Sequence, residues 1–156
     1  MPLPEFNETG DLPNGVHKAS LDETTARFET GSDRRKLIAR RLERIHRIAS
    51  QTGHLARFVV FGSFVTDKQD PNDVDVFMIM DDNFDMGSLA GEPRILFADH
   101  GTAQDHFGAS VFWMRRMAAI GGEQAAIEDW QIKRDGTERG IVEITVEKSC
   151  LQTIKN

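Results

Sequence analysis

The chain has 156 residues, with 25 Asp or Glu against 19 Lys or Arg, and therefore a formal net charge of −6. This length suits one domain with a sizeable core, here residues 1–156. The acidity argues against bulk nucleic-acid binding, which depends on phosphate neutralisation by Lys and Arg. No apolar run reaches the roughly 20 residues that span a bilayer, and the N-terminus does not resemble a signal peptide. Cys150 is the single cysteine, so we expect a cytoplasmic protein without an internal disulfide or thiolate zinc cluster.

The N-terminal part is predicted to be an arm followed by a short helix. Residues 1–18 show little periodicity and are expected to form an extended arm with apolar anchors at Leu3, Phe6, Leu12 and Val16. Ser20-Leu21-Asp22-Glu23 has the form of a capping box, which predicts a helix from there to Phe28.

Residues 32–52 are predicted to form a basic amphipathic helix. Ser32 is a suitable N-cap and Gly53 a suitable stop. The apolar stripe comprises Leu37, Ile38, Leu42, Ile45, Ile48 and Ala49. The basic residues are Arg34, Arg35, Lys36, Arg40, Arg41, Arg44 and Arg47. The simpler interpretation is a solvated face balanced by acidic residues elsewhere in the fold, and the alternative is a surface that attracts a nucleic-acid or protein partner.

The middle of the chain contains the residues that indicate chemistry. The apolar run from Phe58 to Phe61 predicts a strand, and it ends in Gly62-Ser63. Glycine allows a sharp turn and close approach to a ligand. If residues 64–66 begin a short helix, its free N–H groups are suited to binding phosphate.

A second apolar strand follows and opens with alternating carboxylates. Residues i and i+2 of a strand project from one face, so Asp73 and Asp75 are expected to point the same way. Two adjacent carboxylates repel, and Mg²⁺ or Mn²⁺ relieves that repulsion through hard oxygen ligands. The alternative is a polar turn with a solvent-facing aspartate.

Together these segments resemble the polymerase-beta-like nucleotidyltransferase superfamily. The resemblance is carried by Phe61-Gly62-Ser63, a loop over 64–72, and Asp73-Val74-Asp75-Val76. A wider resemblance, to an uncharacterised bacterial family of small single-domain members, includes Leu12-Pro13-Asn14-Gly15-Val16-His17 and Gly140-Ile141-Val142-Glu143-Ile144. The resemblance implies an α/β fold of the nucleotidyltransferase type, with a short mixed β-sheet and helices packed on one face.

The resemblance also implies an activity and roles for individual residues. The protein would move an NMP group from an NTP to a hydroxyl of a protein, RNA or small molecule, with Mg²⁺ (or Mn²⁺) as cofactor. Asp73 and Asp75 would be the catalytic metal ligands, and Gly62 and Ser63 would hold the terminal phosphates. Two cations are further nucleotide-binding candidates, Lys68 in the loop and Arg115 at the end of the strand predicted over 109–114.

One position departs from the superfamily pattern. A third carboxylate usually lies on a later strand, and here Ser110 aligns with it. Three interpretations stay open. The enzyme works with two carboxylates, it recruits Asp99, Asp105 or Glu143, or it has lost catalysis and kept binding. The last would make it a degenerate binding or regulatory protein, for example in a toxin–antitoxin or defence system.

The C-terminal part predicts a helix over 123–130 and then a hairpin. Asp135-Gly136 is a hairpin turn signal between residues 130–133 and 140–146. Lys133, Arg134 and Arg139 bracket the turn. They are interpreted as charges that protect an exposed edge, with contact to triphosphate or acceptor as the alternative. His100 and His106 are interpreted as loop or surface residues.

Overall fold

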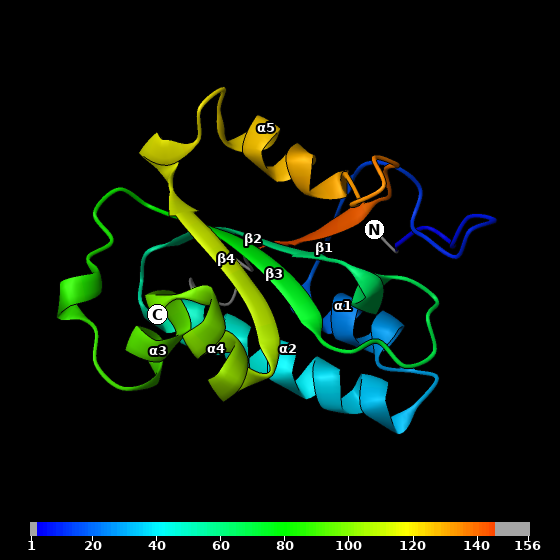
Figure 1. Cartoon of the computed structure of the whole chain (residues 1–156), viewed down its shortest axis with the longest axis horizontal. Helices are drawn as coiled ribbons and strands as arrows, with labels where there is room; N and C mark the ends of the chain where they lie inside the picture. The colour runs from blue at the N-terminus through cyan, green and yellow to red at the C-terminus, as the bar shows by residue number, and fades with distance from the viewer. Residues whose placement is uncertain (1–2, 146–156) are drawn as a thin grey trace, which may run out of the picture.

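A computed structural model describes residues 3–145 and contains a five-stranded mixed sheet (Figure 1). The strand order is β1-β5-β2-β3-β4. The strands are β1 (Val16–Ala19), β2 (Leu55–Phe61), β3 (Val74–Met80), β4 (Ala109–Arg115) and β5 (Ile141–Ile144). This architecture confirms the predicted α/β class and mixed sheet. Cys150 and the predicted end of the last strand at Val146 lie outside the described residues.

The last strand of the chain lies inside the sheet. β5 runs parallel to β1 and antiparallel to β2. On its other side, β2 pairs antiparallel with β3, which in turn pairs parallel with β4. The sheet is therefore complete only when residues near both ends of the described chain come together.

Helices cover both faces of this sheet. They are α1 (Leu21–Phe28), α2 (Asp33–Gln51), α3 (Glu92–Ala98), α4 (His100–Phe107) and α5 (Glu123–Glu128). The first four pack on one face, as predicted, but α5 lies across the opposite face (Figure 1). The prediction of helices on one face is thus wrong for α5. The reason is that the central strands carry apolar residues on both faces, so both faces must be covered. On the second face, Ile127 of α5 packs against Val59 and Phe77. No helix within residues 3–145 is long and apolar enough to cross a membrane.

Local signals correctly located the first two helices. Ser20 and Glu23 form the predicted capping box at the start of α1. The Ser32 side chain accepts a hydrogen bond from the Arg35 backbone N–H at the start of α2. The predicted apolar stripe of α2 is buried except for Leu37, which is 48% exposed.

The N-terminal arm and the C-terminal hairpin differ from prediction. The arm ends in β1, so residues 16–18 belong to the sheet. Residues 129–131 continue α5 as a short 3₁₀ helix, and only one isolated bridge, Ile132 to Glu138, spans the Asp135-Gly136 turn. The predicted turn is confirmed, since the Lys133 N–H donates to the Thr137 carbonyl at 2.7 Å and the Arg139 N–H to the Gln131 carbonyl at 3.0 Å. The prediction is wrong for the second strand, because β5 pairs with β1 and β2 instead of with residues 130–133.

Candidate functional site

The two aspartates lie at the start of β3, on the face that α5 covers in part. Val74 and Val76 are buried on the helix-rich face, and the alternation of the strand turns Asp75 to the other side together with Phe77. Asp73 precedes the strand by one residue. The two carboxylates are near neighbours, since the charge of Asp73 contributes to raising the pKa of Asp75.

Asp75 has an unusual environment for a carboxylate. Burial is the main reason that its pKa rises to about 6, and the adjacent charge of Asp73 adds to the effect. The adjacent Ser110 hydroxyl and the charge of Arg139 lower the pKa of Asp75 in part. The pair is therefore a site of unfavourable negative charge that a cation would stabilise.

Ser110 occupies the neighbouring position on β4. The parallel register pairs Asp75 with Ser110, and the Ser110 hydroxyl donates to Asp73 Oδ2 at 3.1 Å. A hydroxyl thus lies beside the carboxylates, at the position that the resemblance assigns to a third acid.

The Gly62-Ser63 turn abuts the Asp75 carboxylate. Gly62 has φ of +81°, and a Cβ built there would overlap Asp75 Oδ2. Ser63 begins a short 3₁₀ helix to Val65, and the Thr66 hydroxyl donates to the Ser63 carbonyl at 2.7 Å. Glycine is required here both by the backbone conformation and by the closeness of Asp75.

Two arginines of α2 hold the loop between the turn and the aspartates. The buried Arg35 guanidinium donates to backbone carbonyls of Phe28, Phe64, Thr66 and Lys68. Arg34 donates to the carbonyls of Pro71 and Asn72, at 2.6 Å each. Part of the basic helix face therefore positions this loop.

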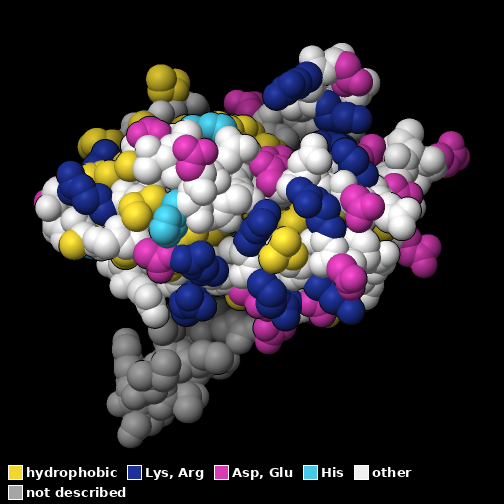
Figure 2. Space-filling model, turned by 60° about the horizontal axis from the view of Figure 1, so that its bottom comes forward, with side chains coloured by type: hydrophobic (Ala, Val, Ile, Leu, Met, Phe, Trp, Pro, Cys, Tyr) yellow, Lys and Arg dark blue, Asp and Glu magenta, His cyan; other side chains and the backbone are white. Residues whose placement is uncertain are grey.

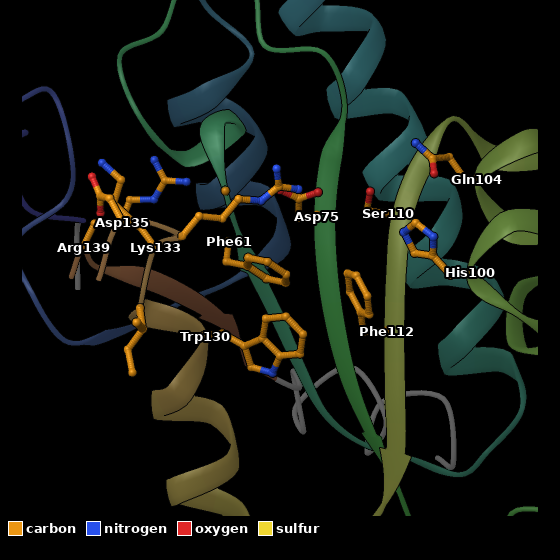
Figure 3. Close-up of a pocket in the computed structure, with 13 residues that line it drawn as sticks. Phe61, Asp75, His100, Gln104, Ser110, Phe112, Trp130, Lys133, Asp135 and Arg139 are labelled. Carbon is orange, nitrogen blue, oxygen red and sulfur yellow. The ribbon is translucent and has the colours of Figure 1, made fainter. Parts of the chain in front are cut away.

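A cavity of about 790 Å³ opens at the Asp75 carboxylate (Figure 3). Asp75, Gly62 and Ser110 lie on one wall. Aromatic side chains form its floor, and His100 and Gln104 of α4 line one side. The opposite side is the loop that follows α5, with Lys133, Arg134, Asp135 and Arg139.

The sequence favoured an edge-protecting role for the cations of that loop, but the structure places them at the cavity. Lys133, Arg134 and Arg139 line the cavity, and the charge of Arg139 affects Asp75. The available signal was the concentration of basic residues around Asp135-Gly136. Its meaning depended on where β5 would place this loop.

The chain is similar to one described protein family. Over residues 4–145 it matches the model of DUF6932, described as a family of unknown function. The chain belongs to this family. No curated protein and no solved structure matches it. Family membership thus assigns no activity, and the roles of the residues in this member of DUF6932 rest on its geometry.

Two predicted nucleotide-binding residues lie away from the cavity in this DUF6932 member. The exposed Lys68 contributes its backbone carbonyl to Arg35. Arg115 donates to the Phe84 carbonyl at 3.0 Å, and its guanidinium lies over the Trp113 ring. It sits opposite Met80, at the far end of the strands that carry Asp75 and Ser110.

The candidate third carboxylates are engaged elsewhere. Glu143 is bound to Arg57, and Asp99 caps α4 by accepting from the Thr102 N–H at 2.8 Å. Asp105 lines a separate groove beside α2. Within residues 3–145, no group of three or more His, Cys, Asp or Glu side chains is placed to hold a metal ion.

The outer face of α2 carries mixed charge. Figure 2 shows Lys and Arg side chains gathered on the lower face of the molecule with acidic side chains among them. Arg40 forms ion pairs with Glu29 and Glu43, and Arg44 with Glu92. These contacts favour the interpretation of a balanced outer face over a free basic surface.

Proposed function

We propose that this protein binds a nucleoside triphosphate with Mg²⁺ and transfers its NMP group to a hydroxyl acceptor. The proposal is carried by one observation. Asp75 lies against Gly62 and lines a cavity whose facing loop carries Lys133, Arg134 and Arg139, and Asp73 is its charged neighbour.

The donor set fits one Mg²⁺ that is shared with a substrate. Asp73 and Asp75 provide two hard oxygen ligands, and Mg²⁺ commonly takes one or two carboxylates together with phosphate oxygens and water. Their mutual repulsion, reflected in the raised pKa of Asp75, is what a cation would relieve. When bound, Mg²⁺ supplies charge neutralisation at the phosphates and orients the reacting groups.

The chain's own residues then bind and orient the triphosphate. The Gly62 backbone admits a phosphate close to the carboxylates, and Lys133, Arg134 and Arg139 offer positive charge from the opposite side. In the reaction, the acceptor oxygen bonds to the α-phosphorus and the bond from that phosphorus to the bridging oxygen breaks. Pyrophosphate leaves with the electron pair, and the hydroxyl proton passes to water. Positioning and charge stabilisation account for most catalysis of this type.

Ser110 favours a second candidate function. A serine in place of a third carboxylate is a poor base and a weak ligand, so the same site would bind a metal-bound triphosphate without turnover. The protein would then be a nucleotide-binding regulatory module that no longer transfers the NMP group to an acceptor.

Calorimetry of each NTP with and without Mg²⁺ or Mn²⁺ tests the proposal. The full chain is compared with the Asp73→Asn/Asp75→Asn double variant, with Asp105→Asn as the control. Metal-dependent binding that disappears only in the double variant supports a working site. Binding that is indifferent to the two carboxylates would contradict it. Release of pyrophosphate in the presence of hydroxyl acceptors separates the enzyme from the binding module.

A further inference from the structure

The floor of the cavity is formed by three aromatic rings. Phe61, Phe112 and Trp130 line it, with ring centroids 4.5 Å apart for Phe61 and Trp130 and 5.0 Å for Phe112 and Trp130. All three are only partly buried, whereas Phe77 beneath Trp130 is 1% exposed. This DUF6932 member thus leaves aromatic surface facing an open cavity.

This aromatic floor directly adjoins the charged wall. Phe61 pairs with Asp75 across β2 and β3, and Phe112 follows Ser110 by two residues on β4. Figure 3 shows the rings between the cationic loop on one side and α4 on the other. A ligand held by its anionic end at Asp75 and the loop would therefore place its remaining part over these rings.

A heterocyclic side chain of the protein already stacks on one ring of this floor. The exposed His100 imidazole stacks on Phe112, with centroids 4.9 Å apart and an interplanar angle of 27°. Stacking of a base on an aromatic side chain tolerates any base, because every base has a π face. Polar side chains line both sides of this floor, His100 and Gln104 on α4 and Lys133 and Asp135 on the facing loop, but the floor itself offers mainly aromatic surface. Stacking area is therefore expected to contribute more to base binding than hydrogen bonds do.

We propose that the floor of Phe61, Phe112 and Trp130 is the nucleobase subsite, and that it prefers purines to pyrimidines. The inference rests on the proposed function and goes further by assigning the ligand class. Purines are favoured because the larger ring system covers more of the aromatic surface.

Wild-type protein provides the first test, by calorimetry in Mg²⁺ with ATP, GTP, CTP, UTP and inorganic triphosphate. ATP and GTP are expected to bind about ten- to a hundredfold more tightly than inorganic triphosphate. The affinities of CTP and UTP are expected to lie between those of inorganic triphosphate and of the purine nucleotides. Equal binding of ATP and inorganic triphosphate, or a preference for pyrimidines, would overturn the proposal.

Variants at Phe112 provide the second test. Phe112→Leu keeps an apolar side chain without a π face, and it should weaken ATP binding about tenfold while leaving inorganic triphosphate unchanged. Phe112→Tyr keeps the π face and should retain the wild-type ATP affinity. Met114→Leu is the matched control, because Met114 lies on the same strand face but outside the cavity lining. Unchanged ATP affinity in folded Phe112→Leu would overturn the subsite.

The two proposals fail in different ways. If inorganic triphosphate and ATP bind equally well and both need Asp73 and Asp75, the nucleobase subsite is wrong and the metal–triphosphate site stands. If neither binds in any metal, the proposed function fails, and the subsite fails with it.

Discussion

The Ser110 hydroxyl donates a hydrogen bond of 3.1 Å to the Asp73 carboxylate, while the β4 register places the same serine opposite Asp75. Ser110 is thus the residue of β4 that lies beside both acids. The identity of this side chain therefore decides whether a third negative charge lies beside Asp73 and Asp75.

Ser110→Asp should make the site more dependent on metal. Without Mg²⁺, a third carboxylate adds repulsion and should lower the free energy of unfolding by about 1–2 kcal/mol. With Mg²⁺, stability should recover and nucleotidyl transfer should rise if the chain is a decayed enzyme. Thermal unfolding with and without Mg²⁺, together with pyrophosphate release, measures both. Ser110→Ala, which loses only the hydrogen bond, should show no gain in either. A Ser110→Asp variant whose stability does not respond to Mg²⁺ would argue against a metal site.

Gly62→Ala should damage the site as well as the backbone. The added Cβ must displace the Asp75 carboxylate, and φ of +81° is itself strained for alanine. We expect a loss of about 2–4 kcal/mol in unfolding free energy and of metal-dependent triphosphate binding. The matched control is Gly53→Ala, where φ is +79° but no atom lies within 4 Å of the new Cβ. Gly53→Ala should cost only about 1 kcal/mol and leave binding intact. Equal effects of the two substitutions would contradict the close approach of Gly62 to Asp75.

Asp75 should make the protein less stable as pH rises from about 4 to about 6. Its folded pKa of about 6 exceeds the value of about 3.9 in an unfolded chain, so the native state holds more protons across that window. The loss is on the order of 3 kcal/mol and is complete by about pH 7, one unit above the folded pKa. Asp75→Asn should remove this dependence and be more stable than wild type at pH 8, whereas Asp105→Asn should keep it. Urea unfolding at several pH values measures how the free energy of unfolding changes with pH. The difference between the wild-type and Asp75→Asn curves isolates Asp75, because the lowered pKa values of Asp99, Asp135 and His46 make stability rise with pH in both proteins. A difference that does not change between about pH 4 and pH 7 would show that Asp75 has an ordinary pKa.

Arg35→Met should destabilise the loop that connects the two halves of the site. The substitution leaves four backbone carbonyls without their guanidinium donor, namely those of Phe28, Phe64, Thr66 and Lys68. We expect a loss of about 2–4 kcal/mol in unfolding free energy. Lys36→Met, at the exposed neighbouring position, should change it by less than about 0.5 kcal/mol. Similar values for the two variants would mean that Arg35 contributes no more than a surface cation.

Short-range patterns were enough to predict much of this protein. Caps at Ser20 and Ser32 act within one helical turn, and alternation along a strand turns Asp75 to one face without help from distant residues. For the same reason, the Gly62-Ser63 turn and the aspartates, separated by one loop, could be recognised as a unit from the sequence. What they bind stays a prediction.

Only the tertiary structure decided which other residues face these carboxylates. The insertion of β5 between β1 and β2 brings the loop with Lys133 and Arg139 to the cavity. The register of β3 with β4 pairs Ser110 with Asp75 and leaves Arg115 at the opposite end of the strands. Sequence spacing could not provide these positions, because strand order and register depend on burying both faces of one sheet at once.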